Sequence, residues 1–309
     1  MSLKRTGLDV HSTSDAYDED ANYGEGQPTL QDPAPFPVDP VFGPSVLSSA
    51  NLPDAPEAKH PLPRLENLSG QVAAHPTTAA VIVAGGIGSR FRQPGGKQLV
   101  DLLGKPVLTW SAEAFDAVPD VGLIVVVCPQ EHLEEYRRVA FDPFDFVTPV
   151  TMVPAGEIRQ ESSMAGVAAV PETFEQIAIH DGARPLVTPS LIMHAISVLK
   201  GELEADGVLV GHPAIDTLKV VRDGAVVGTP DRSIFWDAQT PQIFRAPICR
   251  RAFAAAMQEG FVGTDDSSLV ERIGGKVLLV NGPRDNLKLT VPEDLAPVRA
   301  ALKARIKGA

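Results

Sequence analysis

The chain has 309 residues, a formal net charge of −12 and 44% hydrophobic residues. Its acidic balance argues against a protein that coats DNA or RNA, because such proteins carry a basic surface. We also expect no membrane partner, because no apolar run approaches the ~20 residues of a membrane helix and the N-terminus lacks a secretory signal. Cys128 and Cys249 have neither zinc-site nor redox-pair spacing, which predicts buried thiols in a cytoplasmic protein.

Residues 1–76 differ in composition from the rest of the chain. They hold 11 of the 28 prolines, with 11 acids against 4 bases, so their net charge is −7 and that of residues 77–309 is −5. Prolines cannot donate ladder hydrogen bonds, and the segment shows neither helical nor strand periodicity. We predict a disordered, acidic, Pro-rich tail at 1–76, which is either a solubilising leader or carries a docking motif around Phe36–Phe42.

From Thr78 onward, apolar runs typical of buried parallel strands alternate with helical patterns. This alternation predicts an α/β fold, a Rossmann-like and mostly parallel sheet with helices on both faces, whose ligands bind after the carboxyl ends of the strands. The expected strands are Thr78–Gly85, Val121–Pro129, Phe174–Gly182, Asp206–Ala214 and Lys276–Gly282, and the expected helices are Val107–Val118, Gln130–Ala140, Ser162–Val170, Pro189–Leu199 and Pro247–Glu259.

A glycine-rich loop follows the first expected strand. Its glycines allow a backbone to approach an anion closely, and their N–H groups cradle phosphate. The loop is not a dinucleotide fingerprint, because Phe91 stands where the third glycine belongs, nor a Walker A loop, because Gln98 follows Lys97. What remains is a loop with Arg90 and Lys97 that suits a triphosphate, or a tight turn with two solvated cations.

Further motifs follow in order along the chain: His180–Pro185, Asp216–Lys219, Asp231-Arg232 with Gln239–Gln242, Thr264–Asp266 and Asp285–Thr290. With the glycine loop and Lys97-Gln98, they resemble the 2-C-methyl-D-erythritol 4-phosphate cytidylyltransferase family, which has a sugar-nucleotidyltransferase-like fold. The resemblance runs from about Thr78 to the C-terminus, so the folded domain is expected at 77–309. The tail lies outside it.

The resemblance implies an enzyme of non-mevalonate isoprenoid synthesis that transfers CMP from CTP to a polyol phosphate and releases pyrophosphate. It implies Mg²⁺ as cofactor and a homodimer. Val220–Val227 alternates across Asp223-Gly224, which predicts a hairpin. In the family, the corresponding hairpin, here about 216–237, is a protruding arm that reaches the partner's site, so Arg232 and Thr240 are expected to serve the other subunit.

The resemblance also implies site residues. The expected catalytic residues are Arg90, Lys97, Arg232 and Lys288. The expected CTP-binding residues are Ala84, Gly85, Gly86, Gly88, Ser89, Arg90, Lys97, Gly156, Glu157, Ser162, Gly182 and Lys288, and those that bind the polyol phosphate are Asp181, Arg184, Thr217, Arg232, Thr240, Thr264 and Asp285. No protein metal ligand is expected.

Local alternatives stand beside these roles. Ser162 is an adequate helix N-cap, Asp181 and Arg184 fix a turn before Pro185, and Lys288 lies on a surface strand. The chain also departs from the family pattern, because Gly95-Gly96 lengthen the loop before Lys97 and Ala155 replaces a glycine. A ribitol-5-phosphate cytidylyltransferase is the nearest rival, and a non-catalytic nucleotide-binding domain is a remote one.

Overall fold

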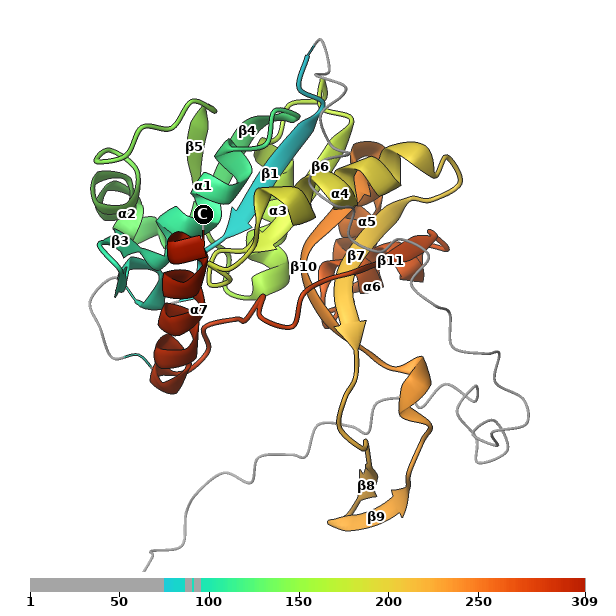
Figure 1. Cartoon of the computed structure of the whole chain (residues 1–309). Helices are drawn as coiled ribbons and strands as arrows, with labels where there is room; N and C mark the ends of the chain where they lie inside the picture. Colours follow the sequence, from blue (N-terminus) through green and yellow to red (C-terminus); the bar gives the residue numbers. More distant parts are fainter. Residues whose placement is uncertain (1–74, 87–90, 92–95, 309) are drawn as a thin grey trace, which may run out of the picture. The chain divides into compact units, whose positions relative to one another are not determined.

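The computed structural model describes residues 75–86, 91 and 96–308. The predicted tail therefore lies outside the described residues, apart from its last two positions. A seven-stranded sheet forms the centre of the described chain, in the order β11-β7-β10-β6-β1-β4-β5 (Figure 1). These strands are β1 (Thr78–Val83), β4 (Val121–Cys128), β5 (Val150–Pro154), β6 (Gln176–Asp181), β7 (Gly207–Pro213), β10 (Trp236–Arg245) and β11 (Val277–Asn281).

Helices cover both faces of this sheet. The first face carries α1 (Val107–Asp116), α2 (Leu133–Ala140) and α4 (Pro189–Gly201). The second carries α3 (Arg159–Ala169), α5 (Ala246–Glu259) and α6 (Asp266–Arg272). A third apolar cluster joins α7 (Leu295–Gly308) to Leu102 of β2 (Asp101–Leu102), the strand that pairs with β3 (Lys105–Pro106). Single 3₁₀ turns complete the described elements: η4 (Lys97–Leu99), η5 (Gln130–His132), η6 (Arg232–Ile234) and η7 (Pro292–Asp294).

The alternation of side chains along β1 explains its unbroken apolar sequence. Ala80 and Ile82 belong to the core under one helical layer, whereas Ala79 and Val81 belong to the core under the other. Both faces of the strand are therefore buried, as is usual for a parallel strand with helices on each side. Both cysteines are buried free thiols, as predicted, and burial raises the pKa of Cys128 to about 12.

The sheet confirms the predicted fold class, but one central strand was missed. β10 runs antiparallel to both β6 and β7, whereas the other pairs in the sheet are parallel. Its sequence contains Pro241, which cannot donate to a ladder and argues against a central strand. The register with β7 shifts between Ala238 and Gln242, so Pro241 lies in the irregular stretch and does not interrupt regular pairing. Strand β5 and helix α6 were also not predicted.

Two local predictions on the site side of the sheet were wrong. Helix α3 begins at Arg159 with Ile158 as its N-cap residue, so Ser162 lies inside the first turn and is not the N-cap. The Glu161 carboxylate accepts the Glu157 and Ile158 N–H groups and takes over the capping that the sequence assigned to Ser162. Lys288 lies in an extended segment between β11 and η7 and not in a strand.

The predicted hairpin is present as β8 (Val220–Arg222) and β9 (Ala225–Gly228). Its turn residues Asp223 and Gly224 have φ angles of 50° and 75°, the left-handed values that tight hairpin turns require. One segment joins this hairpin to β7 and another, which contains η6, joins it to β10, and the hairpin projects away from the sheet (Figure 1). Val221 and Val226 are 58% and 60% exposed, so the hairpin presents apolar side chains to its surroundings.

Gly166 determines how closely α3, and with it Arg159, approaches the sheet. A Cβ at Gly166 would lie 2.3 Å from Cγ1 of Val81 and 2.8 Å from Cγ2 of Val127. We expect Gly166→Ala to lower the free energy of unfolding by about 1–3 kcal/mol through overpacking, despite the better helix propensity of alanine. Denaturant unfolding measures this. Gly201→Ala, where the added Cβ meets open space, is the matched control and should not destabilise. Equal effects of the two substitutions would contradict the close packing.

Candidate active site

Three loops meet where β1, β5 and β6 end. The Ala84 N–H donates to the Val127 carbonyl (2.7 Å) and the Gly182 N–H donates to the Val83 carbonyl (2.9 Å), so the loops leave the sheet side by side. Between them lies a cavity of about 180 Å³. Its described lining consists of Val83, Gly85, Gly86, Lys97, Gln98, Gly156, Glu157, Ile158, Arg159, Ser162, Asp181, Ala183 and Lys288.

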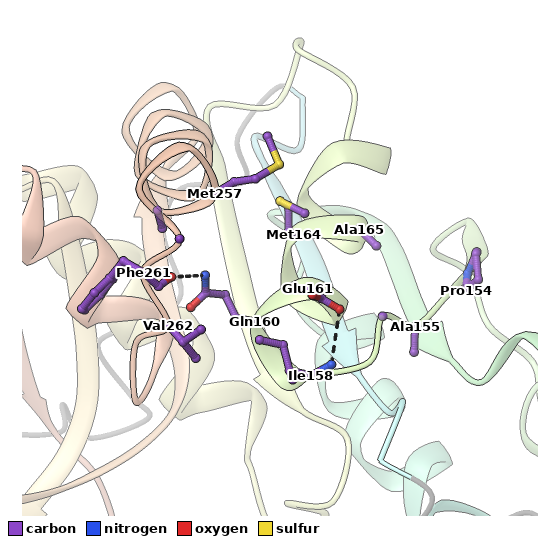
Figure 2. A pocket seen from close by; sticks show the side chains of 13 residues that line it. Pro154, Ala155, Ile158, Gln160, Glu161, Met164, Ala165, Met257, Phe261 and Val262 are labelled. Atoms are coloured by element: carbon purple, nitrogen blue, oxygen red, sulfur yellow. Dashed lines mark hydrogen bonds between the residues drawn. The ribbon is translucent and has the colours of Figure 1, made fainter. Parts of the chain in front are cut away.

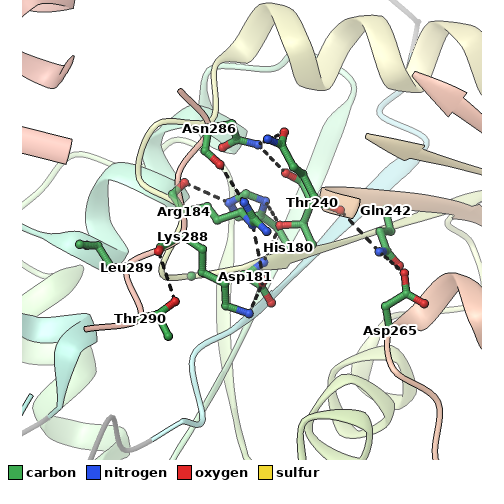
Figure 3. A network of polar contacts seen from close by, with 12 residues as sticks. His180, Asp181, Arg184, Thr240, Gln242, Asp265, Asn286, Lys288, Leu289 and Thr290 are labelled. Carbon is green, nitrogen blue, oxygen red and sulfur yellow. Dashed lines mark hydrogen bonds and ion pairs between the residues drawn. The ribbon is translucent and has the colours of Figure 1, made fainter. Parts of the chain in front are cut away.

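Asp181, the last residue of β6, is the centre of the charged cluster. Lys288 Nζ lies 2.8 Å from its Oδ2, and Arg184 Nε lies 3.6 Å from the same oxygen. Arg159 Nε donates to Oδ1 at 3.1 Å. The Asp181 side chain is only 9% exposed, so one nearly buried carboxylate lies against three cations, of which Figure 3 labels Arg184 and Lys288. The site is therefore locally basic although the chain is acidic.

The pKa values in the cluster follow from burial and charge together. Burial alone would raise the pKa of Asp181, but Arg159, Lys288 and Arg184 outweigh it and hold that pKa well below its ordinary range. Burial lowers the pKa of Arg184, with partial compensation from Asp181. Asp181 therefore stays ionised, and the three cations keep their counter-ion at neutral pH.

His180 and Thr240 support Asp181 from the interior of the sheet. The His180 Nε2 lies 3.3 Å from the Arg184 carbonyl, which can only accept, so Nε2 carries the proton. Nδ1 then accepts the Thr240 hydroxyl at 3.0 Å, while the Thr240 oxygen accepts the Asp181 N–H at 3.1 Å. Both polar side chains are buried, at 0% and 3% exposure, and this chain of hydrogen bonds satisfies them.

Two of the described glycines that line the cavity, Gly85 and Gly156, are required by close contacts. A Cβ at Gly85 would lie 2.4 Å from the Ala155 Cβ, and one at Gly156 would lie 2.3 Å from the Glu161 Cβ. The loop after β1 thus packs directly on the loop after β5. Ser162 is buried beside them, with its hydroxyl 3.0 Å from the Ile158 carbonyl. The loop backbone therefore approaches the cavity without an intervening side chain.

The lengthened loop before Lys97 still delivers this lysine to the cavity. Gly96 has a φ angle of 70°, a conformation that glycine adopts without strain, and η4 begins at the next residue. The Lys97 ammonium donates to the Leu289 carbonyl at 2.8 Å. Lys288 is the neighbour of Leu289 in the chain, so both lysines converge on the same cavity from different loops.

The comparisons with known proteins agree with this arrangement. A family profile described as "IspD: 2-C-methyl-D-erythritol 4-phosphate cytidylyltransferase" matches residues 78–304. A protein of that name from Caldanaerobacter subterraneus is 42% identical over 226 residues, covering 73% of this chain and 98% of its own. The chain belongs to this family. A namesake from Syntrophotalea carbinolica is 40% identical, over 72% of this chain and 94% of its own.

Solved structures agree as well. The 4-diphosphocytidyl-2C-methyl-D-erythritol synthase of Anaerococcus prevotii superposes with a TM-score of 0.65 at 25% identity, over 73% of this chain and 98% of that one. In this cytidylyltransferase-family chain, the predicted residues that line the 180 Å³ cavity together are Gly85, Gly86, Lys97, Gly156, Glu157, Ser162, Asp181 and Lys288. The predicted residues Gly88, Ser89 and Arg90 lie outside the described residues.

Other predicted residues are placed differently. Ala84 and Gly182 are not among the described residues that line the cavity. Thr264 is exposed just before α6, and the Asp285 carboxylate pairs with Arg305 at 2.8 Å. Arg232 and Thr217 lie exposed at the arm, and the Arg232 guanidinium donates to the Ile215 carbonyl. Thr240 lies in β10, against Asp181 of its own chain, and is not at the arm.

The sequence reading assigned no role to the residues that hold the cations, although they stand in motifs that it singled out. Arg184 Nη1 donates to the Asn286 carbonyl at 2.7 Å, and the fully buried Asn286 amide donates to Gln239 Oε1 and to the Thr240 carbonyl. Arg159 also reaches Asp266 in α6 at 2.9 Å. No local spacing signals these contacts, because they join residues about fifty to one hundred positions apart in the chain.

A larger cavity of about 500 Å³ lies beside the charged cluster, between α3 and α5. Met164 of α3 and Met257 of α5 face it, with Phe261 and Val262 at the end of α5 (Figure 2). None of the described residues that line it is a cation. Phosphate recognition depends on cations and backbone N–H groups, so the smaller, charged cavity is the better candidate for the site.

Burial of His180 should make the fold sensitive to mild acid. Burial lowers its pKa to about 3, so the folded chain keeps the ring neutral while the unfolded chain binds a proton below about pH 6.5. This contribution to stability is complete above that pH and is lost as the pH falls, by about 1.4 kcal/mol per unit. Denaturant unfolding between pH 7 and 5 should show a shallower loss for His180→Gln than for the parent chain. Parallel pH profiles would contradict a neutral, buried His180.

Proposed function

We propose that the charged cavity at Asp181 is the site where CTP and the polyol phosphate react. The chain is a cytidylyltransferase of isoprenoid biosynthesis: it transfers CMP from CTP to 2-C-methyl-D-erythritol 4-phosphate, giving 4-diphosphocytidyl-2-C-methyl-D-erythritol and pyrophosphate. The observation that supports this site is the gathering of Arg159, Arg184 and Lys288 around one buried carboxylate, next to glycine backbone.

In this proposal an oxygen of the polyol phosphate attacks the α-phosphorus of CTP, a P–O bond forms, and the bond to the departing pyrophosphate breaks. A phosphate dianion is already a competent nucleophile, so the residues need not remove a proton from it. Their task is to align the two substrates and to neutralise the negative charge that is brought together. A cluster of cations whose counter-ion sits at its centre suits this task.

The roles divide along the cavity. The N–H groups of Gly85 and Gly86 cradle the triphosphate, and Lys97 neutralises charge on the α-phosphate and on the leaving group. Lys288 stands between the two substrates, because its ammonium lies at Asp181 and within the same cavity. Arg90, which lies outside the described residues, is proposed to act with Lys97. Backbone groups of the Gly156 loop contact the base.

The polyol phosphate is proposed to bind on the Arg184 side of Asp181. The Arg184 side chain is 12% exposed and is held by the Asn286 carbonyl, so its guanidinium is oriented before any substrate arrives. A fixed guanidinium binds phosphate through two parallel hydrogen bonds. The carboxylate of Asp181 is then free to accept hydroxyl groups of the polyol as the substrate phosphates take over its cations.

Magnesium is proposed to enter with CTP. Among the described residues there is no group of three or more His, Cys, Asp or Glu side chains that could cage a metal ion. The cavity lining, which includes the Asp181 and Glu157 carboxylates, fits a metal that would be held by triphosphate oxygens and water. When bound, Mg²⁺ neutralises triphosphate charge.

A homodimer is proposed from the exposed arm. Val220, Val221, Val226 and Val227 are all at least 40% exposed on its two short strands, which favours their burial against another chain. In such a dimer Arg232 aims the attacking phosphate in the partner's site.

No helix in the described part of the chain is long and apolar enough to cross a membrane. A cytoplasmic location and a tail dispensable for catalysis remain parts of the proposal.

The substrate assignment is tested by pyrophosphate release. With Mg²⁺, we expect turnover of CTP and 2-C-methyl-D-erythritol 4-phosphate. Replacing CTP by UTP, ATP or GTP, or the polyol phosphate by ribitol 5-phosphate, should lower kcat/KM about a hundredfold. The reason is that polar groups of the site that bind the correct substrate are left without a hydrogen-bond partner by the wrong one. EDTA should abolish turnover and added Mg²⁺ should restore it. Preference for ribitol 5-phosphate would replace the assigned polyol, and binding of CTP without turnover of any polyol would indicate a nucleotide-binding domain.

The arm is tested by mixing two inactive variants. If Arg232 completes the partner's site, Arg232→Ala and Lys97→Ala each inactivate every site, but a mixed dimer has one intact site. Half of the dimers are mixed after free exchange, so about a quarter of the parent activity should return. Arg222→Ala, on the arm but outside the proposed site, is the matched control variant: mixed with Lys97→Ala it should keep about half of the parent activity with or without exchange, and tagged subunits report the exchange itself. No recovery in dimers shown by tags to be mixed would place Arg232 in its own subunit's site or outside any site.

A further inference from the structure

Asp266 occupies an unusual position for a carboxylate that no substrate is expected to touch. It is the first residue of α6, and its side chain is 1% exposed. Its Oδ2 accepts a hydrogen bond from Arg159 Nη2 at 2.9 Å, while Arg159 Nε donates to Asp181 at 3.1 Å. One guanidinium therefore joins the buried carboxylate of α6 to the carboxylate at the centre of the site.

The start of α6 is itself fixed from β10. Gln242 donates from Nε2 to Asp265 Oδ2 at 2.9 Å and accepts the Ser267 N–H with Oε1, also at 2.9 Å. The same strand carries Thr240, which holds the Asp181 N–H. The contacts thus close a ring from Asp181 through Arg159, Asp266, α6 and β10 back to Asp181. A guanidinium that is hydrogen-bonded to two carboxylates, each on a segment fixed by such contacts, has little freedom to rotate.

The Arg159 guanidinium contacts two carboxylates whose pKa values shift in opposite directions, that of Asp181 downward and that of Asp266 upward. Burial raises the pKa of Asp266, and the charge of Arg159 opposes this shift. Arg159 itself is 31% exposed along its side chain, and its pKa is raised because Asp266 and Asp181 outweigh the effect of burial. Without the charge at Asp266, Nη2 of Arg159 would lose its carboxylate partner, and the guanidinium could rotate toward solvent or into the cavity.

We propose that Asp266 is a positioning residue for cytidylyl transfer, which anchors Arg159 so that Arg159 occupies Oδ1 of Asp181 and leaves Oδ2 to Lys288 and Arg184. This inference rests on the proposed function of the site. Through Arg159, Asp266 fixes the orientation of the Asp181 carboxylate. The Asp181 carboxylate in turn fixes the position of the Lys288 ammonium between the two substrates.

The test is a double-mutant cycle on kcat/KM with CTP and 2-C-methyl-D-erythritol 4-phosphate. Asp266→Asn, which keeps the shape but removes the charge, should lower kcat/KM at least tenfold in the parent chain. In the Arg159→Gln background the same substitution should change it less than twofold, because the anchored group is already gone. Equal losses in both backgrounds, or no loss in the parent, would overturn the proposal. Glu259→Gln, which breaks an exposed ion pair with Arg272, is the matched control and should change kcat/KM less than twofold.

A second variant, Arg159→Lys, covers the case in which Asp266→Asn does not fold, and a spectroscopic readout tests folded Asp266→Asn independently of its activity. Arg159→Lys keeps the charge but cannot reach two carboxylates with one planar group, so it should also lose at least tenfold in kcat/KM. Full activity of Arg159→Lys would show that bridging is unnecessary and would overturn the proposal. The Arg159 Nε–H signal in ¹⁵N-labelled protein, assigned by its loss in Arg159→Lys, should exchange with water at least tenfold faster in folded Asp266→Asn. An unchanged exchange rate would also overturn it.

The two readouts separate the inference from the function on which it rests. If the parent chain shows no turnover with CTP and 2-C-methyl-D-erythritol 4-phosphate, the proposed function fails. The exchange rate of the Arg159 Nε–H group still decides whether Asp266 anchors Arg159. If the parent is active and the double-mutant cycle is additive, the function stands and the positioning role of Asp266 is refuted.

Discussion

A carboxylate buried beneath three cations is the interaction on which the rest of the site depends. Asp181 lies 2.8 Å from Lys288, 3.1 Å from Arg159 and 3.6 Å from Arg184, measured between the charged atoms. Three cations this close would repel one another strongly in a partly dry site without a counter-ion. Asp181 provides that counter-ion in the absence of substrate. Substrate phosphates bring the same charge, so binding exchanges one anion for others and leaves the cations in place.

The irregular central strand explains how the fold holds this cluster. β10 alone runs against the direction of its neighbours in the sheet, and its register with β7 shifts around Pro241. Shifts of this kind re-aim side chains near functional sites. Here Thr240 reaches the Asp181 N–H, and Gln242 reaches the start of α6. The Thr240 carbonyl accepts the Asn286 amide, which stabilises the segment that holds Arg184. β10 therefore holds Asp181, the start of α6 and the segment that fixes Arg184.

The fold class was predictable because the buried strands are unbroken apolar runs and the helices between them are amphipathic. Part of the cavity was predictable from the loops that follow β1 and β6, since parallel strands bring their carboxyl ends to one edge of the sheet. Gly156, Ser162 and Lys288 were expected from the family resemblance. β10 was not predictable, because Pro241 and the polar residues around it break the strand pattern. The role of Ser162 was misjudged because Glu161 provides a better cap one residue earlier. The ion pair between Arg159 and Asp266 leaves no local trace in the sequence, since 107 positions separate them.

The most direct measurement of the central claim is the titration of the Asp181 carboxyl carbon by ¹³C NMR in the folded, substrate-free protein. If the three cations hold this carboxylate, it stays more than half ionised at pH 3.8, which is the ordinary pKa of an aspartate side chain. Saturating substrate should perturb the Asp181 signal, because the phosphates then share the cations that Asp181 alone neutralises in the free protein. A midpoint at or above pH 3.8 in the free protein would contradict the account, because burial and not the cations would then dominate at Asp181.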